Sequence, residues 1–273
     1  MKQKLIYGAL VIVIAIIALS VIGMFVFDGI AQSLIQTEGS KGLGVKVTLD
    51  SAHVGFFKKD SNLRGLTIAN PTEFLSEETP NLLSVQAVDM EFGLTSLMGE
   101  TIEIPTASVS GVILNLEQID GMSNIATLID NIAKDDSPKT TEDETKPFNI
   151  GTLTISDITV VARGSFTVID SGPVTAHIKE IVLHNLGTDG NAEVAIEAIT
   201  TAITSAIMQH LADHPIEGFS KLAISQVTGL FDQLPAIGEL GIGETIQGVT
   251  DEIGKGVDDL LQGVGGLLGG GDE

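Results

Sequence analysis

The sequence VDMEFGL at residues 88–94 determines the character of the fold, because apolar and polar residues alternate strictly along it. Side chains two positions apart point to the same face of a β-strand. The pattern therefore predicts a strand with one dry face and one wet face. The dry face of this segment carries Val88, Met90, Phe92 and Leu94. A second alternating segment places Val112, Leu114 and Leu116 on a dry face in the same way.

Similar alternation recurs on both sides of this segment. Residues 45–49, 66–68 and 102–104 each alternate, and turn signals such as Asn70-Pro71 separate the segments. Short alternating runs between turns are typical of an antiparallel meander, so we expect one in residues 28–134. A short helix closes this region. Ser123 is its expected N-cap, and its apolar stripe is formed by Ile125, Leu128, Ile129 and Ile132.

The remaining chain divides into four parts by composition. Residues 135–147, DDSPKTTEDETKP, have no large apolar side chain and predict an acidic, flexible linker. Strand patterns return in a second β region, residues 148–190. Residues 191–234 have helical spacing, interrupted by Pro215. The last part, residues 235–273, is a glycine-rich tail with an amphipathic pattern, and its helix would need a partner surface.

An uncharged run from Leu5 to Phe27 precedes the β region. It is long enough to cross the roughly 30 Å hydrocarbon core of a bilayer as a helix. Lys2 and Lys4 stand before it and Asp28 follows, so residues 1–4 are expected in the cytoplasm and the bulk of the chain across the membrane. The alternative is a cleaved signal peptide, but the apolar part of a signal is normally shorter, about 7–15 residues.

Composition excludes several classes of function. With 14 basic and 36 acidic residues, the chain carries a formal charge of −22, which argues against binding to nucleic acid. The chain has no cysteine and therefore no thiolate site. His210 and His214 stand four apart at a predicted helix end, a spacing that can bind zinc. No third ligand is evident, so we interpret the pair as structural and predict no enzyme activity, metal or cofactor.

The stretch from Leu63 to Asn131 resembles the AsmA-like proteins of Gram-negative envelopes. It contains an R-G-L-x-I-x-N-P strand and turn, a Ser-Leu segment after an alternating strand, and a G-x-S-N-I helix start. The matching residues are Arg64, Gly65, Leu66, Ile68, Asn70, Pro71, Ser96, Leu97, Gly121, Ser123 and Asn124. The resemblance implies an inner-membrane anchor, a curved β-sheet that forms an apolar groove, and a role in outer-membrane lipid homeostasis. The short length and the glycine-rich tail depart from the family pattern.

Together these observations predict a mainly β protein with C-terminal amphipathic helices, anchored in the inner membrane by one N-terminal helix, with its bulk in the periplasm. We expect the dry residues of 88–94 and 112–116 to face phospholipid acyl chains. The alternative is a structural or interaction module in which the same face is a packed core. Envelope proteins could dock on the sheet edge at 178–183 or on the tail at 242–268.

Overall fold

The structure, a computed structural model, describes residues 27–55, 60–93, 96, 99–133, 147–168, 172–188 and 194–231. The predicted anchor at residues 5–27, apart from Phe27, lies outside this range. The same holds for nearly all of the predicted acidic linker and for the glycine-rich tail. Among the described residues, no helix is both long enough and apolar enough to cross a membrane.

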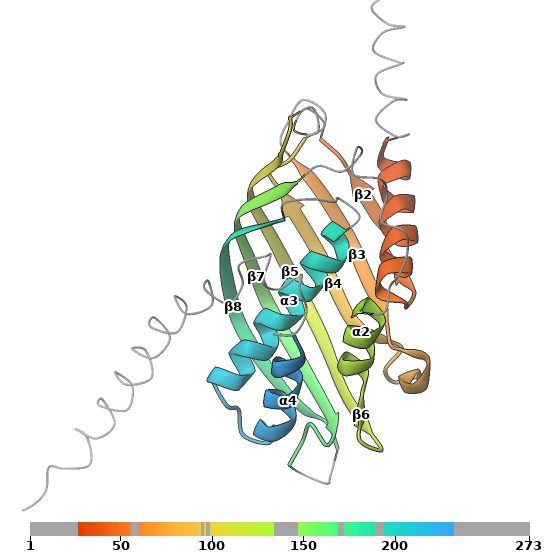
Figure 1. The fold of residues 1–273 in the computed structure, drawn as a ribbon, viewed down its shortest axis with the longest axis vertical. Coiled ribbons are helices and arrows are strands. Elements are labelled where there is room, and N and C mark those ends of the chain that lie inside the picture. Colours follow the sequence, from red (N-terminus) through yellow and green to blue (C-terminus); the bar gives the residue numbers. More distant parts are fainter. Residues whose placement is uncertain are drawn as a thin grey trace, which may run out of the picture.

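A single curved sheet forms the body of the described chain (Figure 1). Its spatial order is β1-β3-β4-β5-β7-β8, while β2 also pairs with β3 and β6 with β5. The strands span Val47–Thr48 (β1), Ser51–His53 (β2), Ser61–Ala69 (β3), Asn81–Met90 (β4), Ile102–Ile119 (β5), Met122–Ser123 (β6), Phe148–Gly164 (β7) and Val174–Thr188 (β8). As predicted, β3 ends directly before Asn70-Pro71, because proline cannot donate to a strand ladder.

The sheet is mixed, and the prediction of a purely antiparallel sheet was wrong at one pairing. β5 and β7 run parallel, in register from Ile102↔Phe148 to Gln118↔Gly164. A parallel pair needs a long crossover, because the chain must return to the end of the sheet where it began. Helix α2 and the residues that follow it supply that return. Alternation within each strand indicates a dry face but not the direction of its neighbour.

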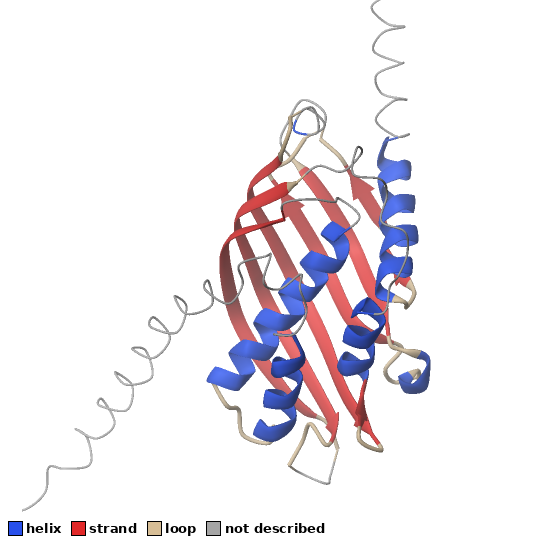
Figure 2. Cartoon of the chain, in the orientation of Figure 1, coloured by secondary structure: helices blue, strands red, loops and turns tan. Residues whose placement is uncertain are grey.

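The helices lie on one face of the sheet, which we call the inner face (Figure 2). They are a helix at residues 27–43, α2 (Asn124–Ala133), α3 (Val194–Asp213) and α4 (Lys221–Phe231), with a short 3-10 turn η1 at Thr72–Phe74. The α2 helix begins where the sequence indicates, since the Ser123 hydroxyl accepts a hydrogen bond from the Ala126 N–H at 3.1 Å. The α3 helix ends two residues before Pro215.

A row of left-handed backbone residues, which we call the crease, crosses the sheet. Gly65 on β3, Gly111 on β5 and Asp157 on β7 have φ of 63°, 65° and 52°. The strand registers place Gly65 and Gly111 on either side of Gln86, and Asp157 beside Gly111. The inward-facing residues on the two sides of the crease are three positions apart instead of the usual two. Val109 and Val112, which are both buried, are an example. The crease thus keeps the inner face apolar while the sheet bends.

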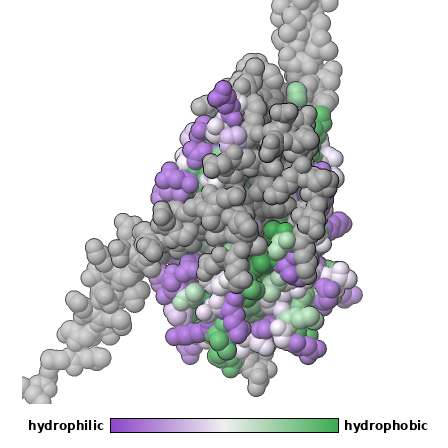
Figure 3. Space-filling model, viewed as in Figure 1, coloured by the Kyte–Doolittle hydropathy of each residue, from purple (hydrophilic) through white to green (hydrophobic). Residues whose placement is uncertain are grey.

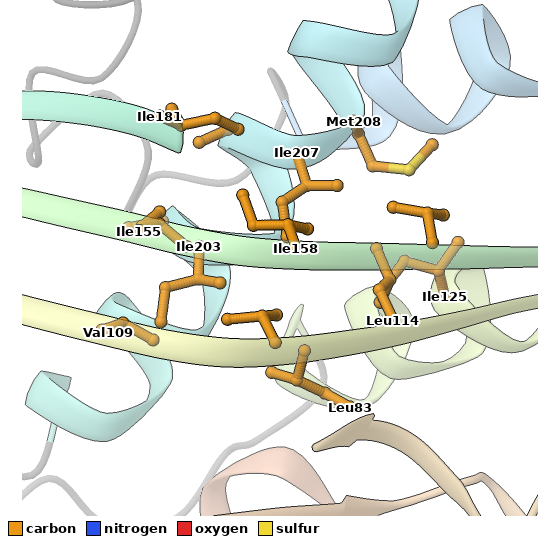
Figure 4. Close-up of a cluster of buried hydrophobic side chains, with 14 of the residues drawn as sticks. Leu83, Val109, Leu114, Ile125, Ile155, Ile158, Ile181, Ile203, Ile207 and Met208 are labelled. Atoms are coloured by element: carbon orange, nitrogen blue, oxygen red, sulfur yellow. The ribbon is translucent and has the colours of Figure 1, made fainter. Parts of the chain in front are cut away.

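Across the crease, inward side chains align from strand to strand. Val109 pairs with Ile155 and Val112 with Ile158, and all four are almost completely buried. Figure 4 shows this cluster facing Ile203, Ile207 and Met208 of α3. The inner face of the described sheet is therefore a packed layer between strands and helices. The resemblance implies an apolar groove at this face, and a packed core was the alternative expectation.

Candidate functional site

The residues predicted to face lipid fall into two groups. Val112, Leu114 and Leu116 on β5 are each 0% exposed and belong to the core. Val88, Met90 and Phe92 are partly buried and pack against that core from β4 and the residues after it. Leu94 lies outside the described residues. Helices cover the β5 group, so the accessible apolar surface lies elsewhere on the molecule.

A cleft of about 460 Å³ lies between α2 and α4 at one end of the sheet. The β5–β6 turn and the end of β7 close its base. Its apolar lining consists of Met122, Ala126, Phe166, Ala223, Val227 and Leu230. Spacings of three and four place the α4 residues of this lining on one face of that helix. Two of the elements that line it, α4 and β6, lie in the lower part of Figure 1, away from the first turn of the helix at 27–43.

Two hydrogen bonds hold the walls of the cleft in place. The Ser220 N–H donates to the Phe166 carbonyl at 2.8 Å, which joins the start of α4 to the residues just after β7. The Ser123 hydroxyl caps the start of α2 on the other side. Phe166 is 0% exposed and lies at the bottom of the cleft. The lining therefore comes from three segments that are far apart in the sequence, within residues 118–130, at Phe166 and within residues 223–230.

Exposed apolar side chains surround this end of the sheet. Met122 is 56% exposed and its hairpin partner Ile119 is 44% exposed. Leu222, one helical turn before Gln226 on the cleft face of α4, is 70% exposed. Figure 3 shows hydrophobic residues at the surface in this lower part, among hydrophilic ones. Apolar residues that gather beside a cleft are typical of a binding surface.

Polar groups at the rim give the cleft a mixed chemical character. Gln118, Thr127 and Gln226 offer amide and hydroxyl groups, and Asp130 contributes a carboxylate. No cationic side chain lines the cleft among the described residues. An apolar floor with a polar, uncharged or negative rim suits a ligand that has an apolar tail and a neutral or cationic head.

This cleft was not predicted. The helical stretch around Leu222, Val227 and Leu230 was expected within residues 191–234, but its partner surface was not. The signal present in the sequence was Leu222, an apolar residue that stands outside the buried face of this stretch and is 70% exposed. What the sequence does not give is the proximity of this stretch to the β5–β6 turn, a contact across about a hundred residues.

His210 lies in the last turn of α3, and His214 directly follows the helix. The rings of His210 and His214 stack with centroids 4.5 Å apart, and the His214 N–H donates to the His210 carbonyl at 2.9 Å. Burial, and then the neighbouring His214, lowers the pKa of His210, while Asp213 acts in the opposite direction. Among the described residues, no group of three His, Cys, Asp or Glu side chains could hold a metal ion.

Several residues that carry the family resemblance have structural roles. Arg64 donates to the Asp89 carboxylate at 2.6 Å across β3 and β4. Gly65 is required because a Cβ there would lie 2.0 Å from the Asp50 carboxylate oxygen. Ser96 is described, and Leu97 lies outside the described residues. Comparisons with protein-family models, curated proteins and solved structures each found no match. The resemblance to AsmA-like proteins therefore rests on these residues alone.

Proposed function

We propose that this chain is a membrane-anchored, non-enzymatic envelope protein that binds lipid acyl chains and contributes to lipid transport or outer-membrane homeostasis. In this proposal residues 5–27 hold it in the inner membrane, with the N-terminus cytoplasmic and the sheet in the periplasm. The apolar run and the flanking lysines support this placement. The resemblance in residues 63–131 supports the lipid role.

One observation carries the proposal: the cleft between α2 and α4. Its volume of about 460 Å³ falls inside the range of about 300–1,000 Å³ that is usual for small-ligand sites. Its floor is apolar, and its rim offers hydrogen-bond partners at the surface. The proposed ligand site is thus at the end of the sheet, and not on the apolar sheet face that the alternating pattern favoured.

The charge of the rim indicates which lipids suit the cleft. Asp130 lies at the rim and the chain as a whole carries a formal charge of −22. An anionic headgroup would meet repulsion there, so a zwitterionic lipid such as phosphatidylethanolamine is the favoured ligand. The headgroup would stay at the polar rim, and one acyl chain would replace water over the more accessible apolar lining, Met122, Ala126 and Leu230.

Site-resolved photocrosslinking tests this proposal, because a membrane anchor alone also retains lipid. The full chain is incubated with a phosphatidylethanolamine that carries a photoreactive acyl chain, and the adducts are mapped by mass spectrometry. We expect adducts on the cleft-lining residues of α2 and α4. Ala126→Trp, which fills the cleft, should remove those adducts, while Ile113→Trp, an exposed position on the outer face of β5, should retain them. Adducts confined to residues 1–27 would contradict the proposal.

The second candidate is an envelope interaction module without a lipid ligand. The complete burial of Val112, Leu114 and Leu116 favours it, since the centre of the inner face has no space for an acyl chain. In that case the exposed apolar end at Met122 and Leu222 would contact a protein. The same crosslinking experiment discriminates the two, because an interaction module should give no lipid adducts in the cleft.

A further inference from the structure

We infer that the outward face of the helix at residues 27–43 contacts the bilayer surface, so that the sheet is held against the membrane at a fixed angle rather than on a free tether. This inference rests on the membrane anchor in the proposed function. The occupant of the surface is lipid, and the surface consists of Phe27, Ile30 and Leu34.

These three residues form an unpartnered apolar stripe. Phe27 is 44% exposed, and Ile30 and Leu34 are each 57% exposed. Spacings of three and four place them on one face of the helix. Further along the same face the exposed positions become polar, at Thr37 and Lys41. The stripe is therefore apolar only in the turns nearest the uncharged run that ends at Phe27.

The opposite face of this helix is bound to the sheet edge. Asp28 accepts a hydrogen bond from the Val54 N–H at 2.9 Å and lies 3.1 Å from His53 Nδ1. The Gln32 amide donates to the Leu49 carbonyl at 2.7 Å. The Ser40 hydroxyl accepts from the Val47 N–H at 2.8 Å.

These contacts are spread over three turns and reach β1, β2 and the loop between them. The helix and the sheet edge therefore move as one body, and the apolar stripe points away from the sheet.

Continuity with the apolar run identifies the occupant. A helix that leaves a bilayer passes through an interfacial layer about 5–8 Å thick. From Phe27 to Leu34 the helix rises about 10 Å. The stripe is thus long enough to cross that layer, and the polar positions Thr37 and Lys41 begin where water is expected. A soluble protein partner would not need the stripe to end at this depth.

A second observation agrees with this placement. Between Gly55 and Asp60 the sequence reads Phe56, Phe57, Lys58 and Lys59, a composition suited to a membrane–water interface. These four residues lie outside the described structure, but β2 before them ends at His53, and the Val54 N–H directly after it donates to Asp28. Lys58 and Lys59, two of only 14 basic residues in the chain, thus follow β2 in the sequence. The end of β2 is attached to the first turn of the helix at 27–43 through Asp28.

Figure 1 shows the first turn of the helix at residues 27–43 at the upper end of the molecule, and α4 and β6, which line the cleft, at the lower end. With the stripe in the bilayer surface, the cleft opens away from the membrane that holds the anchor. A lipid in the cleft would then be presented toward the periplasm.

Single-cysteine labelling of the full chain tests the inference, since the protein has no cysteine of its own. Ile30→Cys, Leu34→Cys and Thr37→Cys variants carry an environment-sensitive fluorophore in vesicles of phosphatidylethanolamine and phosphatidylglycerol. We expect quenchers attached to lipid to act most strongly at position 30, less at 34 and least at 37. An aqueous quencher such as iodide should give the reverse order. Leu75→Cys, at an exposed apolar position after η1, is the matched control and should be accessible to iodide.

Three other outcomes would overturn the inference and are distinguishable. Equal access of iodide to all positions in a protein that stays in the vesicles shows an anchor without surface contact. Protection from both quenchers that disappears at low protein-to-lipid ratio shows a contact between two copies. A protein that does not remain with carbonate-washed vesicles shows that the anchor itself, and with it the proposed membrane placement, is wrong.

Discussion

The side chains of Asn70 and Asn124 are joined by a hydrogen bond of 2.9 Å, in which the Asn124 amide donates to the Asn70 oxygen. Asn70 directly follows β3 and Asn124 begins α2, and both are almost completely buried. Asn124 also donates to the Asn115 carbonyl and accepts from the Glu117 N–H, while Asn70 donates to the Thr79 carbonyl. Two residues of the family-like segments thus form one polar link between the strand end and the helix start.

Loss of this link is expected to destabilise the fold. Asn124→Ala leaves the Glu117 N–H and the Asn70 side chain without their partner in a buried place, at a cost of about 1–3 kcal/mol. Chemical denaturation of the full chain measures the free energy of unfolding of the sheet and its helices. Asn149→Ala removes an exposed amide that contacts Glu103, and should change the stability by less than about 0.5 kcal/mol. Equal effects of the two variants would show that the buried link contributes little.

The crease should not accept a side chain at its centre. Gly111→Ala places a Cβ 2.7 Å from the Gln86 Cβ and forces a left-handed φ of 65° on alanine. The backbone effect alone is about 1–2 kcal/mol, and the clash adds to it. Thermal unfolding followed by circular dichroism should show a lower Tm. Gly29→Ala is the matched control, because a Cβ there meets nothing within 4 Å, and helix propensity should make it neutral or slightly stabilising.

Because α3 packs against the sheet, truncation of its buried side chains should lower the free energy of unfolding strongly. Ile203 is 3% exposed and faces the inward strand residues in Figure 4. Ile203→Ala should cost about 2–5 kcal/mol by loss of transfer energy and by the cavity that remains. Leu222→Ala removes a comparable volume at a 70% exposed position and should change the denaturation midpoint little. A small effect at Ile203 would mean that α3 leaves the sheet easily, and would support access of lipid to the inner face.

Stability should fall in mildly acidic solution because of His210. Its pKa in the folded protein lies below the ordinary value of 6.5, chiefly because burial disfavours the charged ring and then because of His214. The unfolded chain therefore binds this proton more readily than the folded one. The contribution is fully present above the ordinary pKa and is lost as the pH falls through the lowered one.

Urea midpoints between about pH 7.5 and pH 5 measure this effect, since carboxylates change charge mostly below that range. His210→Gln should flatten the dependence in this window, and His177→Gln, on the exposed face of β8, should retain it. A dependence that is unchanged in His210→Gln would contradict the role of the buried ring.

Local patterns in the sequence were enough to place most of the elements. Alternation at 112–116 marked part of β5 and its dry face, while the alternation at 88–94 was wrong as a single strand, because β4 ends at Met90. Ser123 marked the start of α2, and Pro215 the end of α3. The spacing of three between Ile155 and Ile158 also carried the signal of the crease, since both residues are buried on the same face of β7. These features depend on residues close together in the chain, and their physical causes are side-chain periodicity and backbone capping.

Tertiary structure alone decided how these elements combine. The parallel pairing of β5 with β7 depends on the path of the crossover, and neither strand encodes the direction of its neighbour. The covering of the inner face, to which Val112, Leu114 and Leu116 belong, depends on α2 and on α3, which lies about ninety residues later in the chain. The same apolar sheet face could line a lipid groove or pack against helices. The hydrophobic effect is non-directional, and its free energy depends on the apolar area removed from water and not on which group covers that area. The sequence therefore determined which surfaces had to leave water, and the packing of distant helices determined that the cleft between α2 and α4, rather than the sheet face, stays accessible.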